Sequence, residues 1–315
     1  TLALRTGVSS LQSLVILSSK QSAPMVTNAV PEAAFTVNSI GDLGDVNPGD
    51  GICNSSRAGG PVCTLRAAIE EANALAGPDT ITFNIGSGAQ TILLNSPLPT
   101  ITQSLVIDGT PQGGAPASQS IVLNPGTGFT GFAVLTLTSN TNTIRGLTIS
   151  GFNFATAISI TTGSGTIIEG NSILNNGSSG ISINQSSNNI IGGTTAAQRN
   201  VIGGNGGAGV SLSSDTATGN RVLGNYIGTD STGTKALPNG VGITVYSSDN
   251  VIGGTNSSEG NRIWFNSSLA VDVDIGAMRV SVLGNSIYTN GGLGIDLDAN
   301  GVTVNRWLST GFLAA

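Results

Sequence analysis

The chain has 315 residues and a formal net charge of −6. Its 11 Lys and Arg residues are scattered, so the sequence has no basic cluster of the kind that holds the polyanionic backbone of DNA or RNA, which excludes nucleic acid as a partner. No run of about 18 apolar residues is present, which excludes a membrane-spanning helix. The 46 glycines, the aromatic content of 4% and the lack of His are typical of turns and short strands, and they predict an all-β protein.

Residues 1–34 are expected to form an N-terminal extension. Its apolar run, "SLVILSS" from Ser13, reads as a strand that either packs on the rest of the chain or binds a partner. The chain begins at Thr1 rather than Met, as expected where a signal peptide has been removed or left out.

Residues 35–80 form the next predicted unit, a cap segment. It opens with an oxygen-rich stretch, "GDLGDVNPGDG", whose polar side chains are those of Asp42, Asp45, Asn47 and Asp50. Oxygen ligands on a tight loop suit Ca²⁺, although the spacing differs from the twelve-residue calcium loop. A Ca²⁺ site and an ordinary Asp/Asn turn are the two interpretations.

The only two cysteines, Cys53 and Cys63, also lie in the cap segment, with Gly and Pro between them that let the chain fold back. A zinc site needs about four ligands and there is no His to help, so a local disulfide is the favoured prediction. A disulfide would place the protein outside the reducing cytosol, in the secreted or cell-surface compartment, whereas two reduced structural thiols are the alternative.

One amphipathic helix is predicted within "CTLRAAIEEANALAGP", from Cys63 to Pro78. Its apolar stripe consists of Leu65, Ala68, Ile69, Ala72 and Leu75. Gly77 and Pro78 supply the stop signal. Because it precedes the first predicted strand, we expect this helix to cover the open hydrophobic end of a solenoid.

Residues 81–305 carry a repeat. Copies begin at Gly170, Arg199, Gly224, Gly260 and Gly284, as in "GNSILNNGSSGISI" and "GNSIYTNGGLGIDL", and they recur about every 24 to 36 residues. Within each copy the apolar residues alternate, which predicts strands with one buried face. No copy can bury that face alone, but coils stacked as parallel strands can, so the predicted architecture is a parallel β-helix.

One asparagine recurs at the same position of every copy, and these residues are Asn171, Asn200, Asn225, Asn261 and Asn285. A turn there needs a residue that tolerates unusual backbone angles, and its amide can bond to the coil above and the coil below. We therefore predict a structural ladder of asparagines. Asn-X-Ser/Thr triplets are expected by chance at this composition and do not by themselves indicate glycan attachment.

The cap segment also resembles a known family. "CTLRAAIEEAN" from Cys63, with "FTVNSIGDLGDVNPGDGIC" before it and "PDTITFNI" after it, resembles a segment of bacterial surface and secreted proteins named for a Cys-Ser-Leu-Arg-Glu-Ala motif. Thr64 and Ala67 depart from that motif. The resemblance covers about residues 35–305 and implies a right-handed parallel β-helix of the pectin-lyase-like kind.

Four aspartates near the end of the repeat are the candidate site. Asp272 and Asp274 of "AVDVDI" align with Asp296 and Asp298 of "GIDLDA", while the equivalent positions in earlier copies hold Ser, Thr, Asn or Tyr. Since the aliphatic neighbours point inward, the carboxylates face outward on adjacent coils, about 4.8 Å apart. Catalysis, a cation such as Ca²⁺ held by Asp272 and Asp296, and a solvated face are the alternatives. A catalytic site here would have no His, because the chain contains none, and Arg279 is the only basic residue expected near the aspartates.

The leading hypothesis from sequence is a non-enzymatic structural β-solenoid of a bacterial cell-surface layer, adhesin or filament. Charged residues are only 9%, which leaves strand edges poorly protected and favours self-association. The tail, residues 306–315, is expected to be a cap or a partner-binding strand. A polysaccharide lyase or glycoside hydrolase using the aspartates is the first alternative, and a non-catalytic module for cell-surface glycans is the second.

Overall fold

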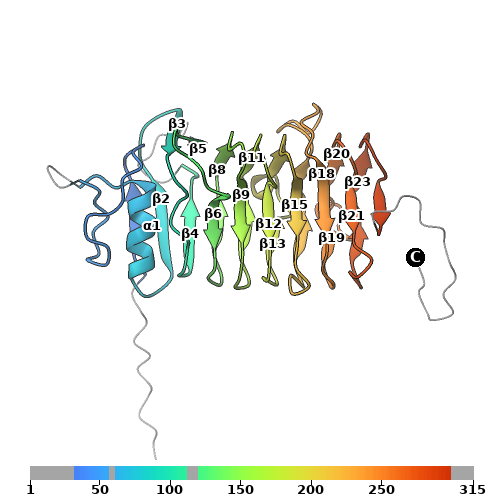
Figure 1. The fold of residues 1–315 in the computed structure, drawn as a ribbon, viewed down its shortest axis with the longest axis horizontal. Coiled ribbons are helices and arrows are strands. Elements are labelled where there is room, and N and C mark those ends of the chain that lie inside the picture. Colours follow the sequence, from blue (N-terminus) through green and yellow to red (C-terminus); the bar gives the residue numbers. More distant parts are fainter. Residues whose placement is uncertain (1–31, 57–60, 112–119, 299–315) are drawn as a thin grey trace, which may run out of the picture. The chain divides into compact units, whose positions relative to one another are not determined.

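The computed structural model describes residues 32–56, 61–111 and 120–298. The predicted tail, and the predicted N-terminal extension except for its last three residues, lie outside this range. The described residues form a stack of short strands, with one α-helix at the N-terminal end of the stack (Figure 1). No described helix is long and apolar enough to cross a membrane.

The described strands form three parallel sheets, and from β4 onward each coil of the chain contributes one strand to each sheet in turn. Sheet A contains β1 (Ala34–Val37), β2 (Asp79–Phe83), β4 (Leu105–Asp108), β7 (Thr143–Arg145), β10 (Ile167–Glu169), β13 (Ile190–Gly192), β16 (Arg221–Leu223), β19 (Val251–Gly253) and β22 (Ser281–Leu283). Sheet B contains β3 (Ala89–Leu94), β5 (Ser120–Pro125), β8 (Leu147–Ser150), β11 (Ser172–Leu174), β14 (Val201–Gly203), β17 (Tyr226–Ile227), β20 (Arg262–Trp264) and β23 (Ser286–Tyr288). Sheet C contains β6 (Ala133–Leu137), β9 (Thr156–Ile160), β12 (Ile181–Ile183), β15 (Ala208–Leu212), β18 (Val241–Val245), β21 (Val271–Val273) and β24 (Ile295–Leu297). A short 3₁₀ turn, Ala196–Gln198, lies between sheets A and B.

Aliphatic residues of successive coils stack directly on one another to form the core. In sheet A, the strand register aligns one inward column of fully buried side chains: Ile107, Ile144, Ile168, Ile191, Val222 and Ile252. Sheet C aligns a second such column: Ile158, Ile181, Val210, Ile243 and Val271. No coil could remove these side chains from water by itself, so the coils stabilise one another. The predicted parallel β-helix is confirmed.

Asparagines hydrogen-bond to one another along the turn between sheets A and B. Each of the first four repeat asparagines donates to the next; for example, the backbone N–H and the side-chain amide of Asn200 both donate to Oδ1 of Asn225, at 3.2 and 3.0 Å. Asn225 in turn donates its amide to the Ile191 carbonyl and to Oδ1 of Asn261. The row runs through Asn171, Asn200, Asn225, Asn261 and Asn285.

Two further asparagine rows occupy the other corners of the coil. The turns between sheets B and C carry Asn176, Asn205, Asn239, Asn266 and Asn290. The turns between sheets C and A carry Asn189, Asn220 and Asn250, preceded by Thr166 and Asn142. Turn backbone N–H groups and strand carbonyls that would otherwise be buried without partners are satisfied in this way at all three corners.

The N-terminal end of the stack is covered by α1 (Leu65–Ala74). The Thr64 hydroxyl accepts from the Ala67 N–H as the N-cap and donates to the Leu43 carbonyl. Glu71 is fully buried and accepts the N–H groups of Gly49 and Gly51, which fastens the oxygen-rich loop to the helix. The predicted disulfide between Cys53 and Cys63 is confirmed.

The asparagine row between sheets A and B makes a prediction for stability. Asn225→Ala removes the acceptor of two buried donors on Asn200, so we expect the free energy of unfolding to fall by about 3 kcal/mol. Urea denaturation followed by circular dichroism measures the change. Asn184→Ala, at an exposed asparagine of the same stack, is the control, with an expected change within about 0.5 kcal/mol. Equal effects in the two variants would contradict the structural role of the row.

Candidate functional site

The outward column of sheet C changes from hydroxyls to carboxylates along the stack. Strand register aligns, in order, Thr136, Ser159, Ser182, Ser211, Thr244, Asp272 and Asp296. The Thr244 hydroxyl donates to the Ser211 hydroxyl at 2.9 Å, so neighbouring coils are close enough for side chains of this column to bond. The column is therefore a continuous polar track that ends in a pair of aspartates.

We call the four aspartates Asp272, Asp274, Asp296 and Asp298 the acidic patch. Asp272 has a neighbour from this group both on its own coil and on the next. It faces outward because Val271 and Val273 on either side of it are buried in the core. Asp296 is its partner in register on β24 and is itself 3% exposed, whereas Asp272 is half-buried. The structure thus brings Asp272 and Asp296 together on adjacent coils.

Asp274 and Asp298 lie just beyond the ends of the two strands. Each continues the ladder by one residue, because the Asp274 N–H donates to the Val245 carbonyl and the Asp298 N–H to the Val273 carbonyl. Oδ1 of Asp274 accepts the Gly276 N–H at 2.9 Å, which fixes this carboxylate in a turn. Asp274 therefore lies two residues after Asp272, in the turn that follows β21, and is close enough to Asp272 to affect its pKa.

The protonation of Asp272 is perturbed by its surroundings. Burial raises the pKa of its carboxyl above the ordinary value, and the nearby carboxylates of Asp296 and Asp274 raise it further. Desolvation and like charge both disfavour the ionised form, so Asp272 keeps its proton to higher pH than an isolated aspartate. A carboxyl group with a raised pKa is a candidate general acid.

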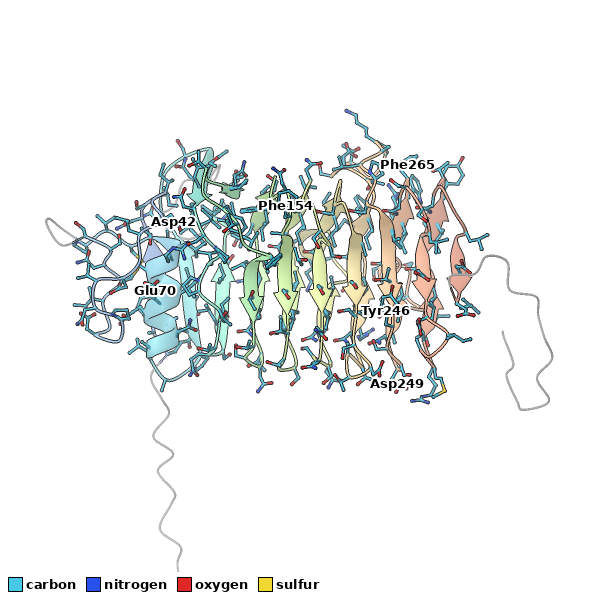
Figure 2. All side chains as sticks on the ribbon, in the orientation of Figure 1. Asp42, Glu70, Phe154, Tyr246, Asp249 and Phe265 are labelled. Atoms are coloured by element: carbon cyan, nitrogen blue, oxygen red, sulfur yellow. A yellow bond between two sulfur atoms is a disulfide. The ribbon has the colours of Figure 1, made fainter. Side chains whose placement is uncertain are left out.

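The one cation predicted beside the patch is bound elsewhere. Arg279 donates from Nε and Nη2 to the two carboxylate oxygens of Asp249, at 2.5 and 2.6 Å. Asp249 lies at the edge of the stack opposite Phe265 (Figure 2), in the turns that lead from sheet C to sheet A. The ion pair lowers the pKa of Asp249 and leaves Arg279 with its charge matched, so it is not available to balance charge on a substrate at Asp272.

The polar side chains of the oxygen-rich loop, those of Asp42, Asp45, Asn47 and Asp50, have separate hydrogen-bond and ion-pair partners. Asp42 pairs with Arg66 at 2.8 Å, Asp45 accepts the N–H groups of Asn47 and Asn54, and the Asn47 amide donates to Asp50. In the described residues, no group of three or more His, Cys, Asp or Glu side chains could hold a metal ion, and this includes the acidic patch. The loop carboxylates act as turn acceptors and helix contacts.

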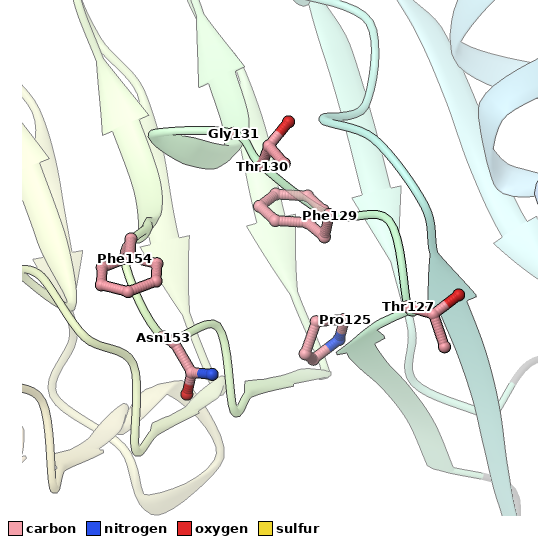
Figure 3. A pocket seen from close by; sticks show the side chains of 8 residues that line it. Pro125, Thr127, Phe129, Thr130, Gly131, Asn153 and Phe154 are labelled. Atoms are coloured by element: carbon pink, nitrogen blue, oxygen red, sulfur yellow. The ribbon is translucent and has the colours of Figure 1, made fainter.

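A hollow of 220 Å³ lies at the edge between sheets B and C (Figure 3). It is formed by the turns after β5 and β8, with Pro125, Phe129 and Phe154 among its lining residues. Phe129 packs edge-to-face on Phe152 at 4.7 Å, while Phe154 is 82% exposed. None of the lining residues has an ionisable side chain, so this hollow offers no group for acid–base chemistry.

Comparison with known proteins agrees with the fold. Residues 117–257 match the protein family described as "Right handed beta helix region". The chain is thus a right-handed parallel β-helix, and the predicted handedness is confirmed. No curated protein sequence matches the chain.

Three similar solved structures are bacterial epimerases. The A-module of the Azotobacter vinelandii mannuronan C-5 epimerase AlgE4 has a TM-score of 0.51 and 16% identity, covering 84% of this chain and 74% of that one. The A-module of AlgE6 from the same organism has a TM-score of 0.42 and 18% identity, covering 84% and 79%. A mutant of the periplasmic alginate epimerase AlgG has a TM-score of 0.37 and 15% identity, covering 74% and 67%.

The sequence-based hypothesis of a structural protein of a surface layer, adhesin or filament is corrected by this comparison. The similar structure with a TM-score of 0.51 is an epimerase named for mannuronan and not a surface-layer or filament protein. The structural hypothesis was based on the small number of charged residues. Few charges leave strand edges less protected against self-association, but they carry no information about catalysis. At 16% identity the likeness establishes the fold, and the chemistry has to be argued from the side chains.

The raised pKa of Asp272 predicts a pH-dependent stability. Between the ordinary value and the raised value, the folded state holds a proton that the unfolded state lacks, so the contribution of Asp272 to the free energy of unfolding falls as pH rises through this window. Asp272→Asn should therefore be more stable than the wild type near pH 7, and its advantage should vanish as the pH approaches the ordinary value of 3.8. Urea denaturation at several pH values measures both trends.

The control for this experiment is Asp215→Asn, an exposed aspartate outside the patch. We expect its stability to follow that of the wild type at every pH. An Asp272→Asn variant that is less stable than the wild type near pH 7 would contradict the charge repulsion in the patch.

Proposed function

We propose that the protein modifies a carbohydrate polymer by acid–base catalysis at the acidic patch of sheet C. The observation that carries this proposal is the raised pKa of Asp272, which stands beside two further carboxylates on an outward face. Asp272 is the general acid, Asp274 is the base, and buried Asp296 acts through Asp272 by keeping it protonated.

Asp272 and Asp274 are both half-buried and supply an acid and a base for hydrolysis of a glycosidic bond. Hydrolysis with inversion requires about 6.5–9.5 Å between the two carboxyl groups, which leaves room for a water between acid and base. Asp272 protonates the leaving oxygen, while Asp274 takes a proton from the water that attacks the sugar carbon. The glycosidic bond breaks as the new carbon–oxygen bond forms.

Elimination and epimerisation are less well supported at this patch. Both begin by removing a proton next to a carboxylate of the sugar, and the negative charge that develops needs a nearby cation. Arg279, the basic residue predicted beside the patch, is held by Asp249. The similar epimerases act on mannuronan or alginate; from them we carry over only the idea of a carbohydrate polymer as substrate.

The polymer is expected to run along the outward column of sheet C. Ser182, Ser211 and Thr244 precede Asp272 in register; Ser182 is half-buried and offers its hydroxyl, whereas Ser211 and Thr244 are buried and bonded to each other. We place this activity outside the cytoplasm, because a disulfide persists in oxidising compartments and the cap segment resembles that of bacterial surface and secreted proteins.

A test of the proposed activity uses a panel of neutral and acidic polysaccharides. Purified protein should release reducing ends from at least one of them, and Asp272→Asn should lower the rate about 10²- to 10⁴-fold because the proton donor is lost. Asp215→Asn is the matched control and should keep full activity. Release of unsaturated ends instead would show elimination and overturn the assigned roles, and no product from any polymer would overturn the proposal.

A further inference from the structure

A row of stacked arginine and aromatic side chains lies on sheet B, around the coil from the acidic patch. We call it the arginine–aromatic row, and it consists of Arg199, Tyr226, Arg262, Trp264 and Tyr288. The guanidinium carbons of Arg199 and Arg262 lie 4.2 and 4.8 Å from the centre of the Tyr226 ring. Arg262 also lies 4.4 Å from the Trp264 ring, which is 5.7 Å from Tyr288.

The register of sheet B produces this row. Tyr226 pairs with Arg262 in the next strand, and Trp264 pairs with Tyr288 in the strand after that. Arg199 reaches Tyr226 from the coil before, where its Nε also donates to the Gly224 carbonyl. The row therefore spans four consecutive coils, about 14 Å along the axis of the stack.

The two arginines of the row lack acidic partners. Arg66, Arg145, Arg221 and Arg279 each pair with a carboxylate, whereas Arg199 and Arg262 make no ion pair in the part of the chain that the structure describes. Both are half-buried against aromatic rings, so their positive charge is held in place rather than left mobile. In a chain of net charge −6, two cations kept free of carboxylates on one face are complementary to an anionic ligand.

A loop borders the row at one side. Arg262 donates from Nη1 to the Gly233 carbonyl at 2.8 Å, and a Cβ at position 233 would lie 2.4 Å from that nitrogen and 2.7 Å from the Tyr226 ring. Gly233 also has φ +70°, which favours glycine. The same loop carries exposed Lys235, whose side chain adds a third cation without an ion pair among the described residues.

We propose that the arginine–aromatic row binds an anionic polysaccharide, a polymer with carboxylates at regular intervals. Arginine presents a planar fork of donors that fits a carboxylate, and the flanks of Tyr226, Trp264 and Tyr288 offer apolar faces to sugar rings. The two guanidinium groups lie 4.2 and 4.8 Å from the centre of the same Tyr226 ring, so together they form one compact positive site for neighbouring anionic groups of an extended chain. This surface goes beyond the proposed catalysis because it requires no turnover.

Binding to immobilised sodium polygalacturonate tests the proposal, with dextran as the neutral polymer. The full chain carrying Asp272→Asn is used throughout, so that the polymer stays intact and failure of the proposed catalysis leaves the binding result readable. We expect binding to polygalacturonate, weakening as NaCl is raised, and no binding to dextran. Arg199→Gln and Arg262→Gln should each weaken the affinity about tenfold through loss of a charge-assisted contact.

Arg221→Gln is the matched control, because Arg221 lies on sheet A one strand before Tyr226 and pairs with Glu259 at 3.3 Å. It should leave the affinity unchanged within about twofold, since its charge is already matched. Salt-independent binding, equal binding to dextran, equal loss in Arg221→Gln, or unchanged affinity in Arg199→Gln and Arg262→Gln would each overturn the proposal. Tighter binding to a single-stranded oligonucleotide than to polygalacturonate would also overturn it.

Discussion

The in-register stacking of parallel coils is the constraint on which the rest of this structure depends. Because each strand pairs with its counterpart one coil away, a residue type that recurs in the repeat becomes a column in space. Inside, columns of Ile and Val exclude water from the core. At the corners, asparagine columns satisfy the turn backbone. Outside, whatever the repeat carries at a given position is displayed in a line along the axis.

The same constraint makes the acidic patch and the arginine–aromatic row physically alike. In both, the strand register places side chains from successive coils close together, and the outcome depends on their chemistry. Asp272 and Asp296 repel each other, which favours the protonated acid. Arginines and aromatic rings attract each other, which fixes the positive charge of Arg199 and Arg262 above Tyr226. The acidic patch on sheet C and the arginine–aromatic row on sheet B can therefore occupy the same two coils on different faces of the stack.

The alternation of aliphatic residues in the repeat was sufficient to predict the stacked strands and the alignment of Asp272 with Asp296. The apolar stripe of residues 65–75 was sufficient to predict the helix. Both patterns depend only on local spacing in the sequence. The second asparagine row was missed although Asn176, Asn205, Asn266 and Asn290 each follow a member of the first row by five residues. The third row is irregularly spaced, because Asn220 precedes Asn225 by five residues whereas Asn189 precedes Asn200 by eleven. The arginine–aromatic row could not be predicted, because Arg199 precedes its strand and only the folded turn brings it to Tyr226.

The turn between Asn225 and Asn239 shows how such a stack can acquire new parts. Here Asn239 follows Asn225 by fourteen positions, whereas the two corner asparagines of the other coils are five positions apart. Both residues still keep their hydrogen bonds to the neighbouring coils. The added length bulges outward between two fixed points, so it changes the surface without disturbing the interior. A sequence of this kind can therefore diversify by lengthening one corner at a time, and the residues that border the arginine–aromatic row occupy such an insertion.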